Sequence, residues 1–258
     1  MWRGDDPVEL RLSVDSVIDQ QLTGNTELTI FFCLDGNLKE PQLHIIDESS
    51  KLVSTIIINN KYSRGLANNL NSGLEEVLKG DFEYIVRMDA DDICLKNRFT
   101  DQLKYLQENP DVDVVGSWSE IIDKNSFTIG TKIVDEVVSF DSLTFSCEVI
   151  HPAVMFRGDF FGKYGFYDGF YEKSQDWELW LRACQKGAII KNIQQSLLKL
   201  RIDSNLVSRR KNEQFYNRKI ISKYSKGLVK YKGLARSWII ELLPLAVLKF
   251  IVNRKYKK

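Results

Sequence analysis

Three aspartates stand within four positions of the chain, immediately after an apolar stretch. Asp89, Asp91 and Asp92 belong to the segment RMDADDICLKNR and follow residues 82–88, which predict a β-strand. Carboxylates this close repel one another, so they need either full solvation or a cation between them. An Asp-x-Asp pair can hold one Mg²⁺ or Mn²⁺, with phosphates and water as the other ligands. The alternative is that Asp92 caps the next helix while the other two are solvated.

The spacing of this segment excludes an EF-hand. A calcium loop that began at Asp89 would need an oxygen ligand at its fifth position and glycine at its sixth. Those positions hold Ile93 and Cys94. Two interpretations therefore remain. Either the acids bind Mg²⁺ or Mn²⁺, or Asp92 caps the next helix and the other two acids are solvated.

Strand-like and helix-like stretches alternate through the first half of the chain and must position these acids. Strands are predicted at 27–36, 53–60, 82–88 and 112–122, and helices at 7–22, 65–80 and 97–110. This alternation is typical of α/β proteins with a mostly parallel central sheet flanked by helices. Such sheets bind ligands at the carboxyl ends of their strands. Asp35 and Asp89 each end a predicted strand, so we expect both at one edge of the sheet.

The pattern loosens after about residue 123. Residues 124–149 predict irregular or mixed structure, residues 174–187 a helix, and residues 188–202 one or two strands. With 43% hydrophobic and 28% charged residues, the composition is that of a soluble globular protein. We expect one α/β domain over residues 1–205 and a basic, partly apolar helical extension over residues 206–258.

The charge of the chain is strongly asymmetric although the net value is only +1. Residues 209–258 contain 15 lysines and arginines but only two acids, Glu213 and Glu241, so the rest of the chain is acidic. An acidic body argues against nucleic acid as a partner. The basic extension suggests an anionic partner instead.

An apolar stretch lies within this extension, at residues 238–251. It is too short to span a bilayer, and Glu241, Pro244 and Lys249 interrupt it. One interpretation is a segment that lies in the interface of an anionic membrane. The other is a C-terminal helix packed on the domain. Isolated cysteines and the polar start MWRGDDPVE favour the cytoplasm, with a peripheral position at the inner face of the plasma membrane as an extension of that view.

Six segments resemble one family of enzymes when they are taken in order. They are CLDG (33–36), SRGLANNLNSGL (63–74), RMDADDICLKNRF (87–99), DVDVVGSW (111–118), HPAVMFR (151–157) and QDWELWLR (175–182). Together they resemble the glycosyltransferase family 2 proteins of bacterial surface-polysaccharide synthesis. The resemblance covers roughly residues 3–205, and its most specific part is the pair MDADD and QDWELW. It implies a GT-A fold and a nucleotide-sugar donor.

The resemblance also implies roles on the donor side. Asp35 would meet the nucleobase, while Arg64 and Gly65 would lie along the nucleotide. Asp89 would face the ribose or the metal, and Asp91 would bind Mn²⁺ or Mg²⁺.

On the acceptor side, the resemblance makes Asp176 the catalytic base. Asp176 taken alone could equally be an acid that complements a helix dipole. Asp92, His151 and Trp118 are weaker candidates for the vicinity of the acceptor or the metal. His151 could instead be a hydrogen-bonded structural histidine, and Trp118 could pack in the core.

The start of the chain departs from the family pattern. Family members begin with an apolar strand that lies centrally in the sheet and helps to form the nucleobase pocket. This chain opens at MWRGDDPVEL, which corresponds to a point after that strand. We therefore expect low stability and weakened donor binding.

These observations predict a metal-dependent, inverting glycosyltransferase of cell-surface glycan synthesis. By family habit the donor would be a UDP-sugar, and the acceptor a polysaccharide or a polyprenyl-diphosphate-linked glycan. Two alternatives remain, a non-catalytic nucleotide-sugar-binding module and a membrane-surface interaction module.

Overall fold

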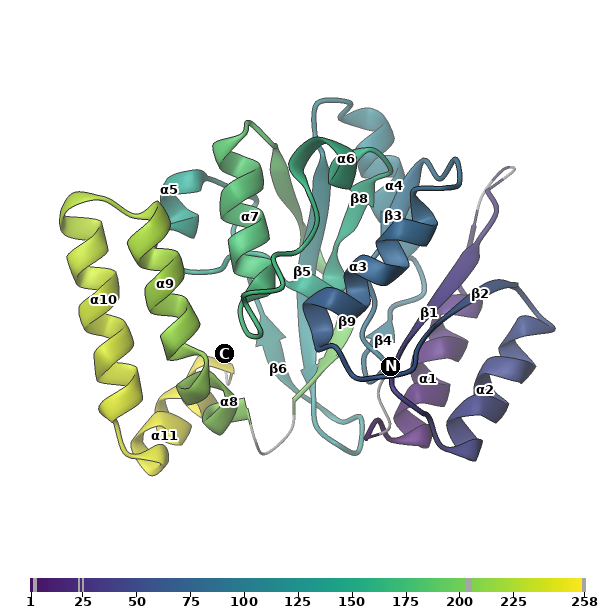
Figure 1. The fold of residues 1–258 in the computed structure, drawn as a ribbon, viewed down its shortest axis with the longest axis horizontal. Coiled ribbons are helices and arrows are strands. Elements are labelled where there is room, and N and C mark those ends of the chain that lie inside the picture. Colours follow the sequence, from purple (N-terminus) through teal and green to yellow (C-terminus); the bar gives the residue numbers. More distant parts are fainter. Residues whose placement is uncertain (2–3, 23, 25, 203–205, 257–258) are drawn as a thin grey trace.

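The protein is an α/β structure in three parts placed side by side. The computed structural model describes residues 1–256 apart from residues 2–3, 23, 25 and 203–205. Figure 1 shows a small two-stranded unit on one side, a mixed sheet in the centre and a group of C-terminal helices on the opposite side.

The small unit comes from the first sixty residues. Its elements are α1 (Pro7–Ile18), β1 (Thr29–Asp35), α2 (Glu40–Ser50) and β2 (Ser54–Asn60). The carboxylate of Asp6 caps α1 by accepting the backbone N–H groups of Val8 and Glu9, at 2.8 and 3.2 Å. β1 and β2 pair in parallel, and α2 connects them. The sequence predicts both strands but not α2.

The central sheet contains seven strands. They are β3 (Tyr84–Val86), β4 (Ile93–Cys94), β5 (Val114–Ile122), β6 (Thr128–Lys132), β7 (Val137–Val138), β8 (Met155–Arg157) and β9 (Ile190–Arg201). Their order is β3-β8-β5-β9-β4, with β6 paired to β5 and β7 paired to β9.

The expectation of a mostly parallel sheet is wrong for the strand directions in the central sheet. β5 and β9 are parallel, but the other five pairings in this sheet are antiparallel. The physical reason is the place of β8, which inserts antiparallel to both neighbours between β3 and β5. β3 and β5 run in the same direction, as strands joined by a helical crossover do, but β8 separates them. The strand β8 has only three residues, and the sequence does not predict it.

Helices complete the structure on both sides of the sheet. They are α3 (Leu66–Val77), α4 (Arg98–Glu108), α5 (Phe140–Leu143), the 3₁₀ turn η1 (His151–Ala153), α6 (Phe160–Tyr164), α7 (Gln175–Gln185), α8 (Leu206–Asn212), α9 (Gln214–Tyr224), α10 (Gly227–Leu242) and α11 (Leu245–Tyr256). The predicted helices at 7–22, 65–80, 97–110 and 174–187 are all present, with shorter bounds. The predicted strand region 188–202 forms the single strand β9.

The C-terminal helices are partly joined to the main core. Ile220, Ile221 and Tyr224 of α9 are buried in the same cluster as Trp180 and Leu181 of α7. Leu248 of α11 packs with Ile121 and Val207. None of the described helices is long and apolar enough to cross a membrane. A boundary between two domains near residue 205 stays a prediction, and residues 203–205 lie outside the described part.

A cavity of about 490 Å³ separates the small unit from the central sheet. Among the described strands, β1 pairs only with β2 and β3 only with β8, so each has one edge facing this cavity. Met1 makes a single step of parallel pairing on β1: its amino group donates to the Cys33 carbonyl (2.7 Å), and the Asp35 N–H donates to the Met1 carbonyl (2.8 Å). Apolar side chains from α1, β1, α3 and β3 line most of the space.

Candidate active site

The three aspartates converge in one turn directly after β3. We call residues 89–92 the acidic turn. One carboxylate oxygen from each of Asp89, Asp91 and Asp92 lies within 4.8 Å of the other two. Asp89 also forms an ion pair with the buried guanidinium of Arg87. The sequence therefore predicted the cluster correctly, but not its arginine partner.

Helix α1 holds the backbone around the acidic turn. The Ser13 hydroxyl donates to the Asp89 carbonyl (2.9 Å), and the Ser16 hydroxyl accepts the Cys94 N–H (2.9 Å). The Gln20 amide donates to the Leu95 carbonyl at 3.0 Å. Ser13 and Ser16 are three positions apart and so share one face of α1, while Gln20 follows just after the end of the helix. This spacing was visible in the sequence, but its purpose was not.

The acids of the turn differ in their readiness to ionise. Burial and the charge of Asp89 raise the pKa of Asp91 to about 6. Burial and both neighbouring acids raise the pKa of Asp92 well above its usual value. For Asp89, burial opposes ionisation, but the charge of Arg87, its hydrogen bond and other nearby positive groups together lower the pKa.

A divalent cation fits this arrangement. Asp92 uses one oxygen to accept the Arg201 backbone N–H (2.7 Å), whereas its buried Oδ2 has no hydrogen-bond partner among the described residues. Carboxylate oxygens are the ligands that Mg²⁺ and Mn²⁺ prefer. A cation here would also remove the repulsion that keeps two of the pKa values high. Asp89, Asp91 and Asp92 are the residues that could hold it.

Part of the predicted donor side lines the same cavity, whereas Arg64 lines a separate pocket beside α3. Asp35, Asp89 and Asp91 all line the cavity. The Asp35 carboxylate accepts the Ser63 hydroxyl (2.8 Å) and the Arg64 backbone N–H (2.7 Å), which fixes the loop before α3. Gly65 begins that helix with φ of 77°, a conformation that glycine adopts readily.

Asp176 lies in the first turn of α7. Burial raises the pKa of its carboxyl, and the backbone N–H of Trp177 and the charge of Lys132 oppose the rise. The charge of Arg87 lowers the pKa of both Asp89 and Asp176, and burial together with both acids raises the pKa of Tyr167. One cationic side chain therefore acts on two acids that are far apart in sequence.

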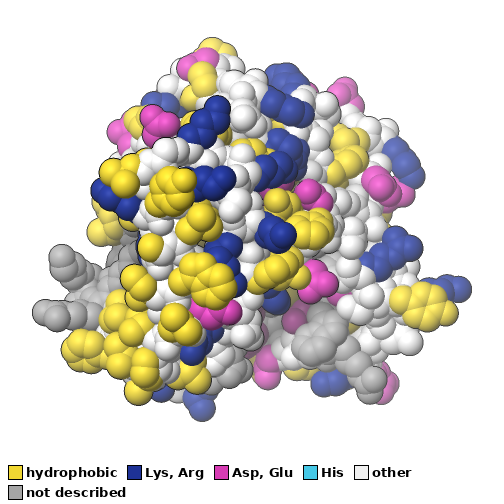
Figure 2. All heavy atoms as spheres, turned by 60° about the vertical axis from the view of Figure 1, so that its left-hand side comes forward, with side chains coloured by type: hydrophobic (Ala, Val, Ile, Leu, Met, Phe, Trp, Pro, Cys, Tyr) yellow, Lys and Arg dark blue, Asp and Glu magenta, His cyan; other side chains and the backbone are white. Residues whose placement is uncertain are grey.

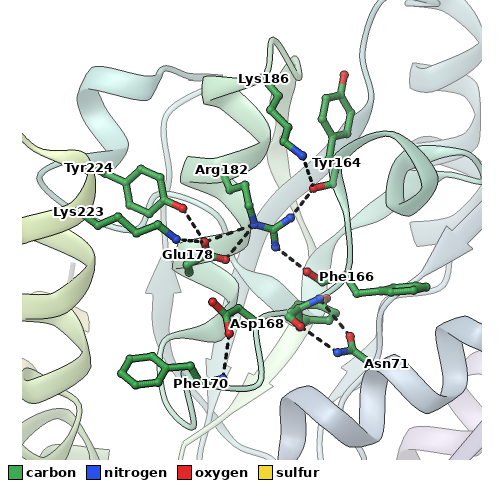
Figure 3. A network of polar contacts seen from close by, with 11 residues as sticks. Asn71, Tyr164, Phe166, Asp168, Phe170, Glu178, Arg182, Lys186, Lys223 and Tyr224 are labelled. Carbon is green, nitrogen blue, oxygen red and sulfur yellow. Dashed lines mark hydrogen bonds and ion pairs between the residues drawn. The ribbon is translucent and has the colours of Figure 1, made fainter.

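A polar network braces α7 from both sides (Figure 3). Glu178 is fully buried and accepts hydrogen bonds from Tyr224 (2.5 Å) and Lys223 (3.0 Å) of α9. It also pairs with Arg182, whose guanidinium donates to the Phe166 carbonyl at 2.6 Å and to the Tyr164 carbonyl.

The other side of the Figure 3 network starts on α3. The Asn71 side chain donates to the Tyr167 carbonyl (2.8 Å) and accepts the Tyr167 N–H (3.0 Å). The loop between α6 and α7 is thus held from α3 and from α7.

Two of the three weaker candidates, His151 and Trp118, have structural contacts. His151 is buried, its Nε2 lies 2.7 Å from the Tyr167 hydroxyl, and burial with the nearby Arg87 lowers its pKa to about 3. It is therefore a neutral imidazole beneath the site. Trp118 donates its indole N–H to the Val134 carbonyl (2.8 Å) and packs against a core cluster. For both residues the geometry matches the structural alternative, while a role toward acceptor or metal stays a prediction.

The sequence matches a known family over a large part of its length. Residues 7–160 match the profile of glycosyl transferase family 2. The chain belongs to glycosyl transferase family 2. This glycosyltransferase thus carries the matched region on α1 to β8, which includes the acidic turn.

Curated relatives agree with this membership. The amylovoran biosynthesis glycosyltransferase AmsE of Erwinia amylovora is 24% identical, over all of this chain and 97% of its own length. The Escherichia coli enzyme named UDP-Gal:alpha-D-GlcNAc-diphosphoundecaprenol beta-1,3-galactosyltransferase is 28% identical over 80% of this chain and 73% of its own length.

Solved structures confirm the GT-A fold of this glycosyltransferase. Staphylococcus aureus TarS in complex with UDP-GlcNAc matches with a TM-score of 0.64 at 13% identity, covering 90% of this chain and 68% of that one. The mannosyltransferase PcManGT from Pyrobaculum calidifontis, in complex with GDP-Man and Mn²⁺, also has a TM-score of 0.64 at 13% identity. That match covers 98% of this chain and 73% of the other.

Several residues of this glycosyltransferase that shape the site had no signal in the sequence. Arg98 is fully buried and donates to the Arg87 carbonyl (2.8 Å), which holds the end of β3 from beneath. Arg201 contacts the acidic turn from β9, 110 positions further along the chain. Sequence spacing says nothing about such distant partners.

Proposed function

We propose that this protein is a metal-dependent, inverting glycosyltransferase that moves a sugar from a UDP-sugar to a glycan acceptor. The observation that carries the proposal is the convergence of three carboxylates at the end of β3, with Asp176 acting on the same Arg87 and Tyr167 from α7. The acidic turn would bind a metal and the donor diphosphate, and Asp176 would act as the base.

The chain's own residues would divide the work. Asp89 and Asp91 orient the donor's ribose and diphosphate end, and Asp35 with Arg64 and Gly65 borders the nucleotide. Asp176 takes the proton from the acceptor hydroxyl, whose oxygen forms a bond to the anomeric carbon as the bond to the diphosphate breaks. Attack from the face opposite the leaving group inverts that carbon. A bound Mn²⁺ or Mg²⁺ supplies Lewis-acid stabilisation of the departing diphosphate.

The nature of donor and acceptor is inferred from relatives. The TarS complexes contain UDP and UDP-GlcNAc, and the name of the E. coli relative specifies UDP-Gal and a diphosphoundecaprenol-linked sugar. AmsE is named for amylovoran biosynthesis. We infer that the acceptor is a polyprenyl-diphosphate-linked or polysaccharide glycan of cell-surface synthesis.

A lipid-linked acceptor would require contact with a membrane, and we assign that contact to α10 and α11. Trp238, Ile239, Leu242, Leu245 and Phe250 are exposed on these helices, with Leu242 at 77%. Figure 2 shows this side of the molecule, where hydrophobic side chains gather with lysines and arginines between them. Apolar side chains mixed with basic ones are typical of helices that bind anionic lipid. The enzyme would then be cytoplasmic and peripheral at the inner face of the plasma membrane. The last two lysines of the extension lie outside the described residues.

Calorimetric titration of UDP with and without Mn²⁺ tests the donor part of the proposal. We expect Mn²⁺-dependent binding that Asp91→Ala reduces by at least about tenfold, because a ligand oxygen is lost. Asp159→Ala, which removes an exposed carboxylate of the Lys163 ion pair, is the control and should leave affinity unchanged. Binding that ignores both the metal and Asp91→Ala would contradict the proposal.

A further inference from the structure

We propose that Arg201 is a positioning residue of the acidic turn, a group that holds Asp91 and Asp92 so that they converge with Asp89. The inference rests on the proposed metal-dependent function, which gives the convergence its purpose. Arg201 ends β9, and two of its groups reach the turn. Its Nε–H donates to the Asp91 carbonyl (2.8 Å), and its backbone N–H donates to the Asp92 carboxylate (2.7 Å).

The opposite edge of the same guanidinium is equally engaged. It donates to the Asp123 carbonyl (2.8 Å) and to the Ser126 hydroxyl (3.1 Å), both in the tight turn between β5 and β6. The Glu9 carboxylate of α1 lies 3.4 Å from Nε. The Arg201 side chain is only 4% exposed. One planar cation therefore joins the acidic turn to α1 and to the β5–β6 hairpin.

These contacts determine where the acids point. The Asp91 carbonyl belongs to the peptide unit between Asp91 and Asp92. A hydrogen bond to that oxygen fixes the orientation of this peptide plane, and with it the directions of the Asp91 and Asp92 side chains. Without it, three repelling carboxylates would be free to turn apart. Groups that orient metal ligands from outside commonly change metal affinity by about 10- to 100-fold when they are removed.

Lysine cannot replace Arg201 in this place. An ammonium keeps the positive charge, but it has one nitrogen, whereas the guanidinium uses three in fixed directions. Arg201→Lys therefore removes the geometry while it retains the charge. The backbone bond to Asp92 survives in this variant, so the loss is confined to the side chain.

Arg157 offers a matched control. Its guanidinium donates to three backbone carbonyls, those of Val112 (2.7 Å), Leu106 (2.7 Å) and Asn109 (2.9 Å), away from the acidic turn. Arg157→Lys costs a comparable set of bonds. Any effect that both variants share is a general loosening of the fold.

The experiment combines hydrogen–deuterium exchange with Mn²⁺ titration followed by electron paramagnetic resonance, on the full chain below its unfolding temperature. We expect Arg201→Lys to speed exchange in peptides that span residues 88–96 and to weaken Mn²⁺ binding by about 10-fold or more. Arg157→Lys should change neither by more than about twofold. Ser126→Ala is a milder variant for the case in which Arg201→Lys does not fold, and we expect a smaller increase of exchange in the same peptides.

Two results would overturn the positioning role. One is unchanged exchange at residues 88–96 in folded Arg201→Lys, or in Ser126→Ala if the first variant does not fold. The other is an equal change in Arg157→Lys. If exchange rises as expected but the wild-type protein binds no Mn²⁺, the positioning role stands and the metal-dependent function fails, so the two failures are distinguishable.

Discussion

Asp176 is the residue on which the chemistry of transfer is expected to depend. We predict that Asp176→Asn lowers kcat by about 10²- to 10⁴-fold, because a general base is removed, while UDP affinity changes little. Steady-state kinetics together with calorimetry separate the two effects. Asp159→Asn, at an exposed acid, should leave kcat unchanged. A parallel loss of UDP affinity in Asp176→Asn would instead place this acid on the donor side.

The pH dependence follows from the environment of the same residue. Burial raises the pKa of Asp176, so its carboxyl becomes protonated at a higher pH than an ordinary aspartate would. A protonated carboxyl cannot accept the acceptor's proton. The acid limb of the kcat–pH profile should therefore lie above the usual aspartate value of about 3.9.

At the scale of elements, the Glu178 network decides how α7 is held. Its carboxylate joins α7 to α9 without solvent exposure. Burial opposes ionisation of Glu178, but the Tyr224 hydrogen bond and the charges of Arg182 and Lys223 hold its pKa below the ordinary value. Ionised Glu178 therefore stabilises the native state above the unfolded glutamate pKa of about 4.3, and this contribution is lost as the pH falls through the lower native value.

We predict that Glu178→Gln lowers the free energy of unfolding by about 2–3 kcal/mol at pH 7, because it removes a fully buried charge that pairs with the partly buried Arg182 and the half-exposed Lys223. The difference from the wild type should shrink as the pH drops below about 4. Urea unfolding at several pH values measures both. Glu76→Gln, at an exposed pair with Lys79, should change stability by less than about 0.5 kcal/mol. A difference that persists at low pH would show that packing, not charge, is what Glu178 contributes.

The cavity lies between β1 of the small sheet and β3 of the central sheet. Met1 continues the ladder of β1 for one residue, and the apolar walls beyond it are not filled by the described side chains. Unfilled apolar space of this kind lowers stability, since its lining lacks partner atoms.

At the scale of the whole molecule, the proposed contact of α10 and α11 would determine how the protein is oriented on a membrane. We predict that the double variant Leu242→Ser/Phe250→Ser reduces binding to phosphatidylserine-containing vesicles by more than about tenfold, because each exposed apolar side chain contributes about 1.5–3 kcal/mol when buried. Sedimentation with vesicles measures the partition. Higher salt should weaken wild-type binding, since lysines and arginines share the surface.

The matched control for this surface is Leu43→Ser/Leu52→Ser, which changes two exposed leucines on the opposite side of the molecule near α2. It should bind vesicles like the wild type. Equal binding of all three proteins, or equal binding to neutral vesicles, would remove α10 and α11 from the proposed contact.

Much of this protein was predictable because its signals are local. Continuous apolar runs followed by acids indicated β1 and β3. The order of the motifs predicted the GT-A fold and the family. These features depend on residues close together in the chain, where periodicity and turn chemistry act directly.

The tertiary structure decided what depends on distant partners. β8 enters the sheet between β3 and β5 as three residues with no strand signal of their own, because pairing with two neighbours stabilises what local preference does not. Arg201 meets Asp91 from 110 positions away, and Glu178 meets Tyr224 from 46. The sequence by itself determined which acids could do chemistry, whereas the folded chain decided which cations and helices hold them, since those contacts exist only once separate segments pack together.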